Sequence, residues 1–244
     1  MLKDYLRRSR SPRYAVVFAA PLLVLYEVLS AALTGSAVAG VRNGADVLLK
    51  SLFVALGGRD GLVVFGVLLI GAGVTIVWRD VRRSGEGVRA GVLGWMLVES
   101  AVYAAVFGTV ISFLTSALLE GPRALAAGGG GAAALGLHTQ LVVSLGAGIY
   151  EELLFRVILV GALLWLGRRV GLSRLPSGAV AVVLSALIFS AFHYVGALGD
   201  TFTVSSFTFR AIAGLAFSAL YVARGFGVTA WTHALYDLGL ALLQ

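Results

Sequence analysis

Seven apolar stretches, separated by polar connections, limit what this chain can fold into more than any other feature of its sequence. They cover residues 14–34, 60–78, 91–119, 138–167, 177–197, 207–223 and 228–243. Most reach the roughly 17 to 25 residues with which a helix crosses a bilayer, and the last two are short. A bilayer offers no water to an unpaired backbone, so segments of this kind cross it as helices. The sequence therefore predicts an all-α, polytopic transmembrane helical bundle.

The positions of the basic residues predict an orientation. Of the 19 Lys and Arg residues, 13 lie in alternate connections. They are Lys3, Arg7, Arg8, Arg10, Arg13, Arg79, Arg82, Arg83, Arg89, Arg168, Arg169, Arg174 and Arg224. By the positive-inside rule these connections face the cytoplasm, which predicts a cytoplasmic N-terminus in an inner or plasma membrane. The net charge of +7 then reports topology and indicates no nucleic-acid partner.

An eighth helix is predicted between the first two apolar stretches. Arg42, Asn43, Asp46 and Lys50 recur at helical spacing among apolar residues, which is typical of an amphipathic helix near the membrane interface. The chain thus reads as a single membrane domain, residues 1–244, with seven to eight helices. Its N-terminal part, residues 1–137, ends in a Gly-rich tract that predicts an outer loop.

Three charged residues interrupt the fourth apolar stretch, where each charge costs several kcal/mol, about 2.5 to more than 10, unless it is paired or hydrated. They are Glu151, Glu152 and Arg156. Glu152 and Arg156 are four residues apart on one helix face, which predicts an ion pair. Glu151 lies about 100° around the helix and is left to face other groups.

Two histidines lie in the later apolar stretches. His193 follows Phe189 by one helical turn, and Asp237 follows His233 by one turn, so that Asp237 can hold the His233 imidazole in one tautomer. A carboxylate and an imidazole can deprotonate water and stabilise an oxyanion. One Glu and two His are also a minimal ligand set for a divalent metal such as zinc. Composition alone does not decide between metal-free hydrolysis, a metal site and a proton pathway. In each case we expect an intramembrane polar cavity around Glu151, His193 and His233.

The three polar motifs together resemble a known family. Glu151-Glu152-x-x-x-Arg156, Phe189-x-x-x-His193 and His233-x-x-x-Asp237 occur in this order on successive apolar segments. Their order and spacing resemble the CPBP family of intramembrane proteases, also called Abi or CAAX-protease-like proteins. The resemblance covers residues 138–244 and implies that this part is the catalytic core of a CPBP-type protease.

The resemblance also implies roles for the six motif residues. Glu151 would activate water, supported by the ion pair of Glu152 with Arg156, while His193 and His233 would contact the water and the oxyanion. If a metal is bound, the two histidines and Glu151 would be its ligands. The family's third motif frequently ends in Asn, and Asp237 stands there in this chain. An ionised Asp only accepts hydrogen bonds, so Asp237 would orient His233 or, when protonated, donate.

The function implied by the resemblance is an intramembrane endopeptidase. It would hydrolyse a peptide bond of a membrane-associated, prenylated or other peptide or protein substrate at the lipid bilayer. Family members are described both as metalloproteases and as glutamate proteases, and the lack of Cys and of an HExxH helix favours the reading without metal. Two alternatives stay open: a proton-coupled transporter, and a non-enzymatic membrane scaffold or immunity protein.

Overall fold

The computed structural model describes residues 2–33, 42–119, 136–196 and 199–243, and these residues form helices joined by turns and short irregular connections. In chain order the helices are α1 (Leu2–Ser9), α2 (Pro12–Ala32), α3 (Gly44–Gly57), α4 (Asp60–Ser84), α5 (Ala90–Leu119), α6 (Leu137–Gly146), η4 (Ala147–Glu151), η5 (Leu153–Leu159), α7 (Val160–Arg169), α8 (Arg174–Phe192), α9 (Val204–Arg224) and α10 (Phe226–Leu243). The predicted all-α class is confirmed. The Gly-rich loop predicted before residue 136 lies outside the described residues.

Within the described part of the chain, five helices are long and apolar enough to cross a membrane: α2, α4, α5, α8 and α9. The protein is an integral membrane protein, as its hydropathy indicated. If the run from α6 to α7 is counted as one helix, the described residues form nine helices, one more than the upper predicted number. The additional helix is α1, which the hydropathy could not indicate because its sequence is polar. Asp4 pairs there with Arg7 and with Arg8, at 2.8 Å each.

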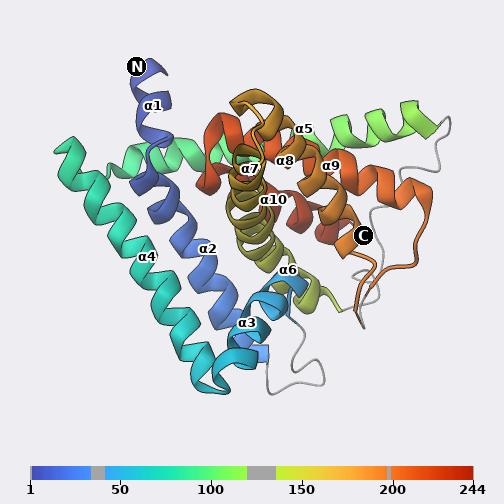
Figure 1. Ribbon diagram of the computed structural model, residues 1–244, viewed down its shortest axis with the longest axis horizontal. Helices are drawn as coiled ribbons and strands as arrows, with labels where there is room; N and C mark the ends of the chain where they lie inside the picture. Colours follow the sequence, from blue (N-terminus) through green and yellow to red (C-terminus); the bar gives the residue numbers. More distant parts are fainter. Residues whose placement is uncertain (1, 34–41, 120–135, 197–198, 244) are drawn as a thin grey trace.

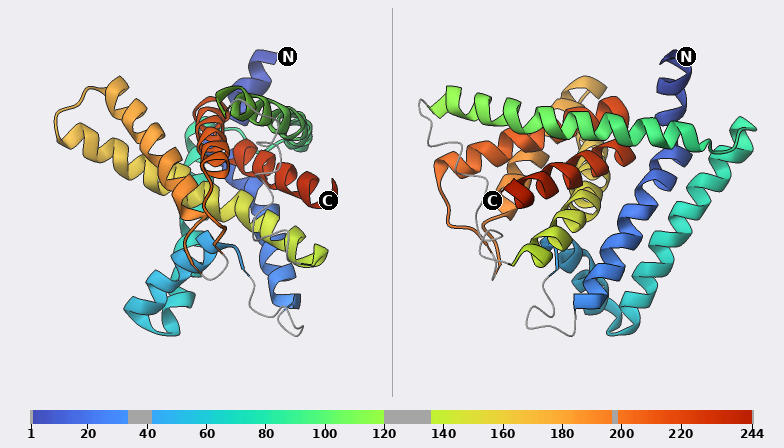
Figure 2. Two further views of the ribbon diagram at one scale, coloured as in Figure 1. Left: turned by 90° about the vertical axis from the view of Figure 1, so that its right-hand side faces the viewer. Right: turned by 180° about the vertical axis from the view of Figure 1, so that it is seen from behind.

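The helices cross one another at large angles and do not form a parallel bundle. Helices α5, α9 and α10 run across the direction of α2 and α4 (Figure 1; Figure 2, right). Helix α10 packs against α2, α5, α6 and α9, so it lies at the centre of the molecule. This central helix carries His233 and Asp237, and it faces the helix that carries the two glutamates.

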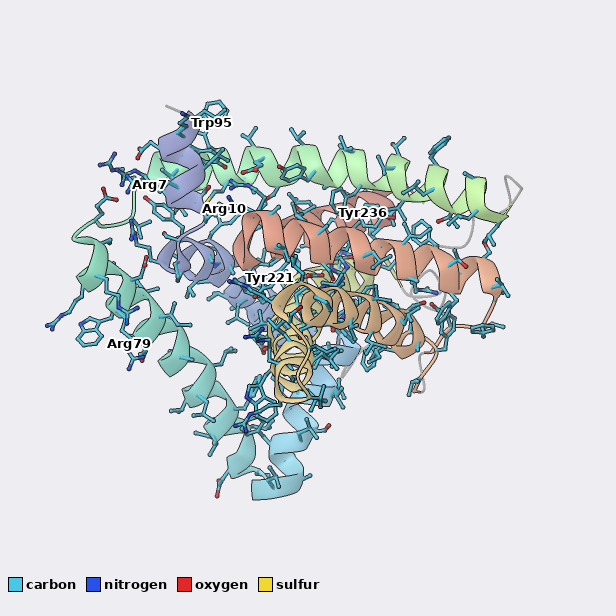
Figure 3. The ribbon with its side chains drawn as sticks, turned by 45° about the horizontal axis from the view of Figure 1, so that its top comes forward. Arg7, Arg10, Arg79, Trp95, Tyr221 and Tyr236 are labelled. Carbon is cyan, nitrogen blue, oxygen red and sulfur yellow. The ribbon has the colours of Figure 1, made fainter. Side chains whose placement is uncertain are left out.

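Ion pairs hold the N-terminal end of the bundle together. Arg8 pairs with Glu86 at 2.5 Å, and Arg13 pairs with Asp80 at 2.8 Å, which joins α1 and α2 to the end of α4. Figure 3 shows Arg7 on α1 and Arg79 on α4 on the same side of the molecule. The clustering matches the distribution of basic residues in the sequence, while the assignment of this end to the cytoplasm stays a prediction.

Candidate functional site

The helix that carries the two glutamates is π-helical at its centre. Helix α6 continues into η4 and η5 and then into α7, with right-handed helical dihedrals at each junction. A π-helix hydrogen-bonds from residue i to i+5, is rare, and occurs frequently at functional sites. Glu151 ends η4 and Glu152 joins the two π-helical segments. The wider turns thus coincide with the charged motif.

Two glycines let this helix approach its neighbours closely. A Cβ atom added at Gly148 would lie 2.5 Å from the carbonyl oxygen of Ala230 and 2.6 Å from the Cβ of Ala234, both on α10. A Cβ atom at Gly146 would lie 2.5 Å from Cε2 of Tyr26 on α2. A larger residue at Gly148 would force the backbones of η4 and α10 apart, so Gly148 sets the distance between the glutamates and α10, while Gly146 makes room for the Tyr26 side chain.

We expect Gly148→Ala to destabilise the protein by about 1–3 kcal/mol, because the added methyl group meets backbone that cannot move aside. The melting temperature in detergent would fall, and activity would fall with it, since η4 would shift relative to His233. Gly161→Ala is the matched control, because no atom lies within 4 Å of the Cβ added there. Equal melting temperatures for the two variants would show that the contact with α10 is not tight.

Glu152 is the hub of the buried polar cluster. Its Oε2 atom lies 3.2 Å from Nε of Arg156, which confirms the ion pair predicted from the spacing. Its Oε1 atom accepts a hydrogen bond from Nδ1 of His233 at 2.7 Å, a contact that the sequence did not indicate. Glu152 is fully buried, and the Arg156 guanidinium stacks 4.5 Å from the ring centroid of Phe189. One carboxylate therefore serves a cation on its own helix and an imidazole on α10.

His233 is held on three sides. Its Nδ1 atom meets Glu152, and its Nε2 atom lies 3.5 Å from Oδ2 of Asp237, one turn further along α10. Its ring stacks on Phe217 of α9, with the centroids 4.4 Å apart. Because each ring nitrogen faces a carboxylate, the surroundings favour an imidazole that carries protons on both nitrogens.

His193 follows the last residue of α8, and one of its ring nitrogens is hydrogen-bonded to the backbone of that helix. Its Nδ1 atom lies 2.8 Å from the carbonyl oxygen of Phe189. A carbonyl only accepts, so Nδ1 donates and Nε2 is the nitrogen free for chemistry. The Phe189 ring lies 4.8 Å from the ring of His193 and 6.2 Å from that of His233, so the two histidines flank one aromatic side chain.

Glu151 is buried, and its two oxygens are in different situations. Oε1 accepts a hydrogen bond from Nδ2 of Asn43 at 2.7 Å. Oε2 has no hydrogen-bond partner among the described residues. The carboxylate interacts electrostatically with both His193 and His233. The three groups predicted to act together thus lie near enough for their charges to interact.

Asn43 is the contact that the sequence analysis missed. The sequence placed it on an amphipathic surface helix, whereas the structure places it at the N-cap of α3, with only 3% of its surface exposed. It lies 108 residues from Glu151 in the chain, so no local pattern joins the two. One feature of the sequence could have indicated its role as a cap: Asn43 stands immediately before the start of a predicted helix, where Asn is a typical N-cap residue.

The donor atoms of this site do not fit a catalytic zinc ion. Within the ranges that the structure describes, no three His, Cys, Asp or Glu side chains are placed to hold a metal. Both nitrogens of His233 face carboxylates, which leaves Nε2 of His193 and Oε2 of Glu151 from the predicted ligand set. Catalytic zinc sites in proteins ordinarily use three protein ligands.

Comparison with protein families supports the resemblance carried by the three motifs. Residues 133–239 match the family described as type II CAAX prenyl endopeptidase Rce1-like. No match was found among curated proteins or among solved structures. The matched residues include all three polar motifs, and with them the carboxylates and imidazoles that the fold brings together. The match over residues 133–239 confirms the resemblance that the motifs predicted, to the CPBP family of CAAX-type proteases.

Proposed function

We propose that this protein is an intramembrane endopeptidase in which Glu151 activates a water molecule. The observation that carries the proposal is the asymmetry of the Glu151 carboxylate: Oε1 is held by Asn43, while Oε2 is buried and has no described partner. A buried carboxylate oxygen is costly when it is left unpaired, so such a position suits a group that binds water during the reaction. A carboxylate in this position can act as a general base.

The proposed reaction transfers one proton through Glu151. Glu151 takes a proton from water as the oxygen attacks the scissile carbonyl carbon, and it later gives that proton to the leaving amide nitrogen. His193 stabilises the oxyanion through Nε2 when that nitrogen carries a proton. His233, held between Glu152 and Asp237, supplies positive charge beside the intermediate. Arg156 fixes Glu152 and so the orientation of His233.

The substrate we propose is a peptide or protein segment that reaches this site from the membrane, with prenylated C-terminal sequences as the first class to test. The family description supports this choice. The lipid bilayer is the second partner, because the described helices α4 and α5 expose many large apolar side chains. In this proposal, water activated by Glu151 hydrolyses the peptide bond. The His, Asp and Glu side chains of the site give no reason to include a metal.

The direct test is hydrolysis of a farnesylated peptide with a C-terminal Cys-aliphatic-aliphatic-X sequence by the purified protein in liposomes. In heavy-oxygen water, mass spectrometry should find the label in the new carboxylate of the product. The rate should stay within about twofold after treatment with EDTA or phenanthroline, with a zinc protease treated in parallel as the control. A rate that collapses on chelation and returns with zinc would contradict the mechanism without metal.

The same liposomes separate the two alternatives. A proton-coupled transporter would dissipate an imposed pH gradient and leave the peptide intact. A scaffold would do neither while remaining folded. The proposed hydrolysis would be contradicted if neither the prenylated peptide nor any of a panel of unmodified membrane peptides were cleaved by the folded protein.

A further inference from the structure

We propose that Asn43 positions Glu151 for catalysis, and that a polar cluster around the start of α3 holds Asn43 in place. The inference rests on the proposed function, since it gives Glu151 its reactive orientation. Asn43 belongs to the N-terminal half of the chain, outside the residues that match the family model. The site would thus extend beyond the three motifs on the C-terminal helices.

The Asn43 side chain uses both ends of its amide. Oδ1 accepts a hydrogen bond from the backbone N–H of Ala45 at 2.9 Å and caps α3. Nδ2 donates to Oε1 of Glu151 at 2.7 Å. A helix N-terminus offers only donors and an ionised carboxylate offers only acceptors, so a single orientation of the amide satisfies both. The cap therefore aims the donor at Glu151.

The backbone of Asn43 is fixed by buried polar neighbours. Its N–H donates to the hydroxyl of Tyr26 at 3.2 Å, and this hydroxyl donates to Oδ2 of Asp46 at 2.8 Å. Asp46 is fully buried, and it pairs with Arg42 and with Lys50, at 2.7 Å each. A buried carboxylate with two cations and a phenol is well compensated for the loss of water. This arrangement leaves the start of α3 little freedom to move.

A second connection joins α3 to the helix of Glu151. Tyr150, the residue before Glu151, donates to Oε1 of Glu27 at 2.5 Å. The same oxygen lies 2.7 Å from Nζ of Lys50 on α3. Neighbouring residues of η4 are therefore tied to α2 and α3 through separate contacts. Together these contacts fix the rotation of η4 about its axis and leave Oε2 as the reactive oxygen of Glu151.

The test is Asn43→Ser, which separates capping from donation. Serine is as good an N-cap as asparagine, but its hydroxyl is too short to take the place of the amide at Glu151. We expect kcat to fall by about ten- to a hundredfold, the loss expected for a hydrogen bond to a charged group. KM should stay within about twofold. The melting temperature should fall, because Oε1 of Glu151 is left buried without a donor, so kcat is expressed per folded molecule. Thr203→Ala is the matched control, because it removes the N-cap of α9, which accepts from Ser206 N–H, far along the chain from Glu151.

A readout without substrate keeps this test independent of the proposed reaction. The infrared carboxylate bands of Glu151 are identified by subtracting the spectrum of Glu151→Gln. Asn43→Ser should shift these bands, since Oε1 loses a donor, and Thr203→Ala should not. The other charged groups that face Glu151 are unchanged in both variants: Arg156 on its own helix, His193 after α8, and His233 and Asp237 on α10.

The outcomes are distinct. Shifted bands with a reduced kcat support the positioning role. Unshifted bands, or shifted bands with an unchanged kcat, overturn it. If the unmodified protein cleaves no peptide, the proposed function fails, and the bands alone still decide whether Asn43 holds the Glu151 carboxylate.

Discussion

Glu151→Gln should lower kcat by about 10²–10⁴-fold, the contribution typical of a general base. The amide keeps the size of the side chain, and its oxygen can still accept the hydrogen bond from Asn43, so the fold should survive. What is lost is the ability to take a proton from water. The measurement is kcat on the farnesylated peptide in liposomes, with the melting temperature recorded for each preparation.

The control for Glu151→Gln is a partly buried glutamate away from the site. Glu99 on α5 pairs with Arg224 at 2.6 Å and accepts a hydrogen bond from Tyr103. Glu99→Gln should lower stability while leaving kcat per folded molecule within about twofold. Full activity of Glu151→Gln would remove Glu151 from the mechanism, and equal losses in the two variants would point to a general effect of losing a buried carboxylate.

Glu152→Leu should reduce the free energy of unfolding by about 3–5 kcal/mol, the usual cost of removing one member of a buried ion pair. The guanidinium of Arg156 is 1% exposed, and its Nε and Nη1 atoms have no hydrogen-bond acceptor among the described residues. Glu152 is its one described ion-pair partner. The variant would leave a cation among the rings of Phe189 and Phe217 without its ion-pair partner. The melting temperature in detergent measures the effect.

A double variant separates stability from catalysis at this pair. Glu152→Leu with Arg156→Leu removes both charges, and replacement of a whole buried pair by apolar residues is often neutral for stability. Stability should therefore return toward that of the unmodified protein. Activity should not return, because His233 still lacks its partner at Nδ1. A double variant no more stable than Glu152→Leu alone would show that the unpaired charge was not the cause of the loss.

Contacts within one helical turn could be read from the sequence. The spacing predicted the pairing of Glu152 with Arg156 and the proximity of His233 to Asp237, and both are found, at 3.2 Å and 3.5 Å. The amphipathic pattern also predicted the helix that the structure shows as α3. Such contacts depend on the helical repeat alone, which a single stretch of sequence contains.

Contacts between distant helices could not be read in the same way. The bond from Glu152 to His233 spans 81 residues, and that from Asn43 to Glu151 spans 108. Each depends on the angle at which helices cross, and this angle follows from side-chain packing that no local pattern records. The family resemblance brought Glu151, His193 and His233 to attention, but it offered nothing for Asn43, which lies outside the resembling segment.

The π-helical stretch has a consequence for any alignment made along this helix. Each wide turn takes up one residue more than an α-helical turn, so the residues of α7 are out of phase with those of α6. A helical wheel drawn through the whole stretch would assign α7 residues to faces that they do not occupy. Insertion of one residue into an α-helix rotates the residues that follow by about 100°, and a π-helical turn is a place where such a residue is taken up. The number of residues in this stretch therefore determines which faces of the helix its residues occupy. Engineering of the helix should substitute residues there without inserting or deleting any.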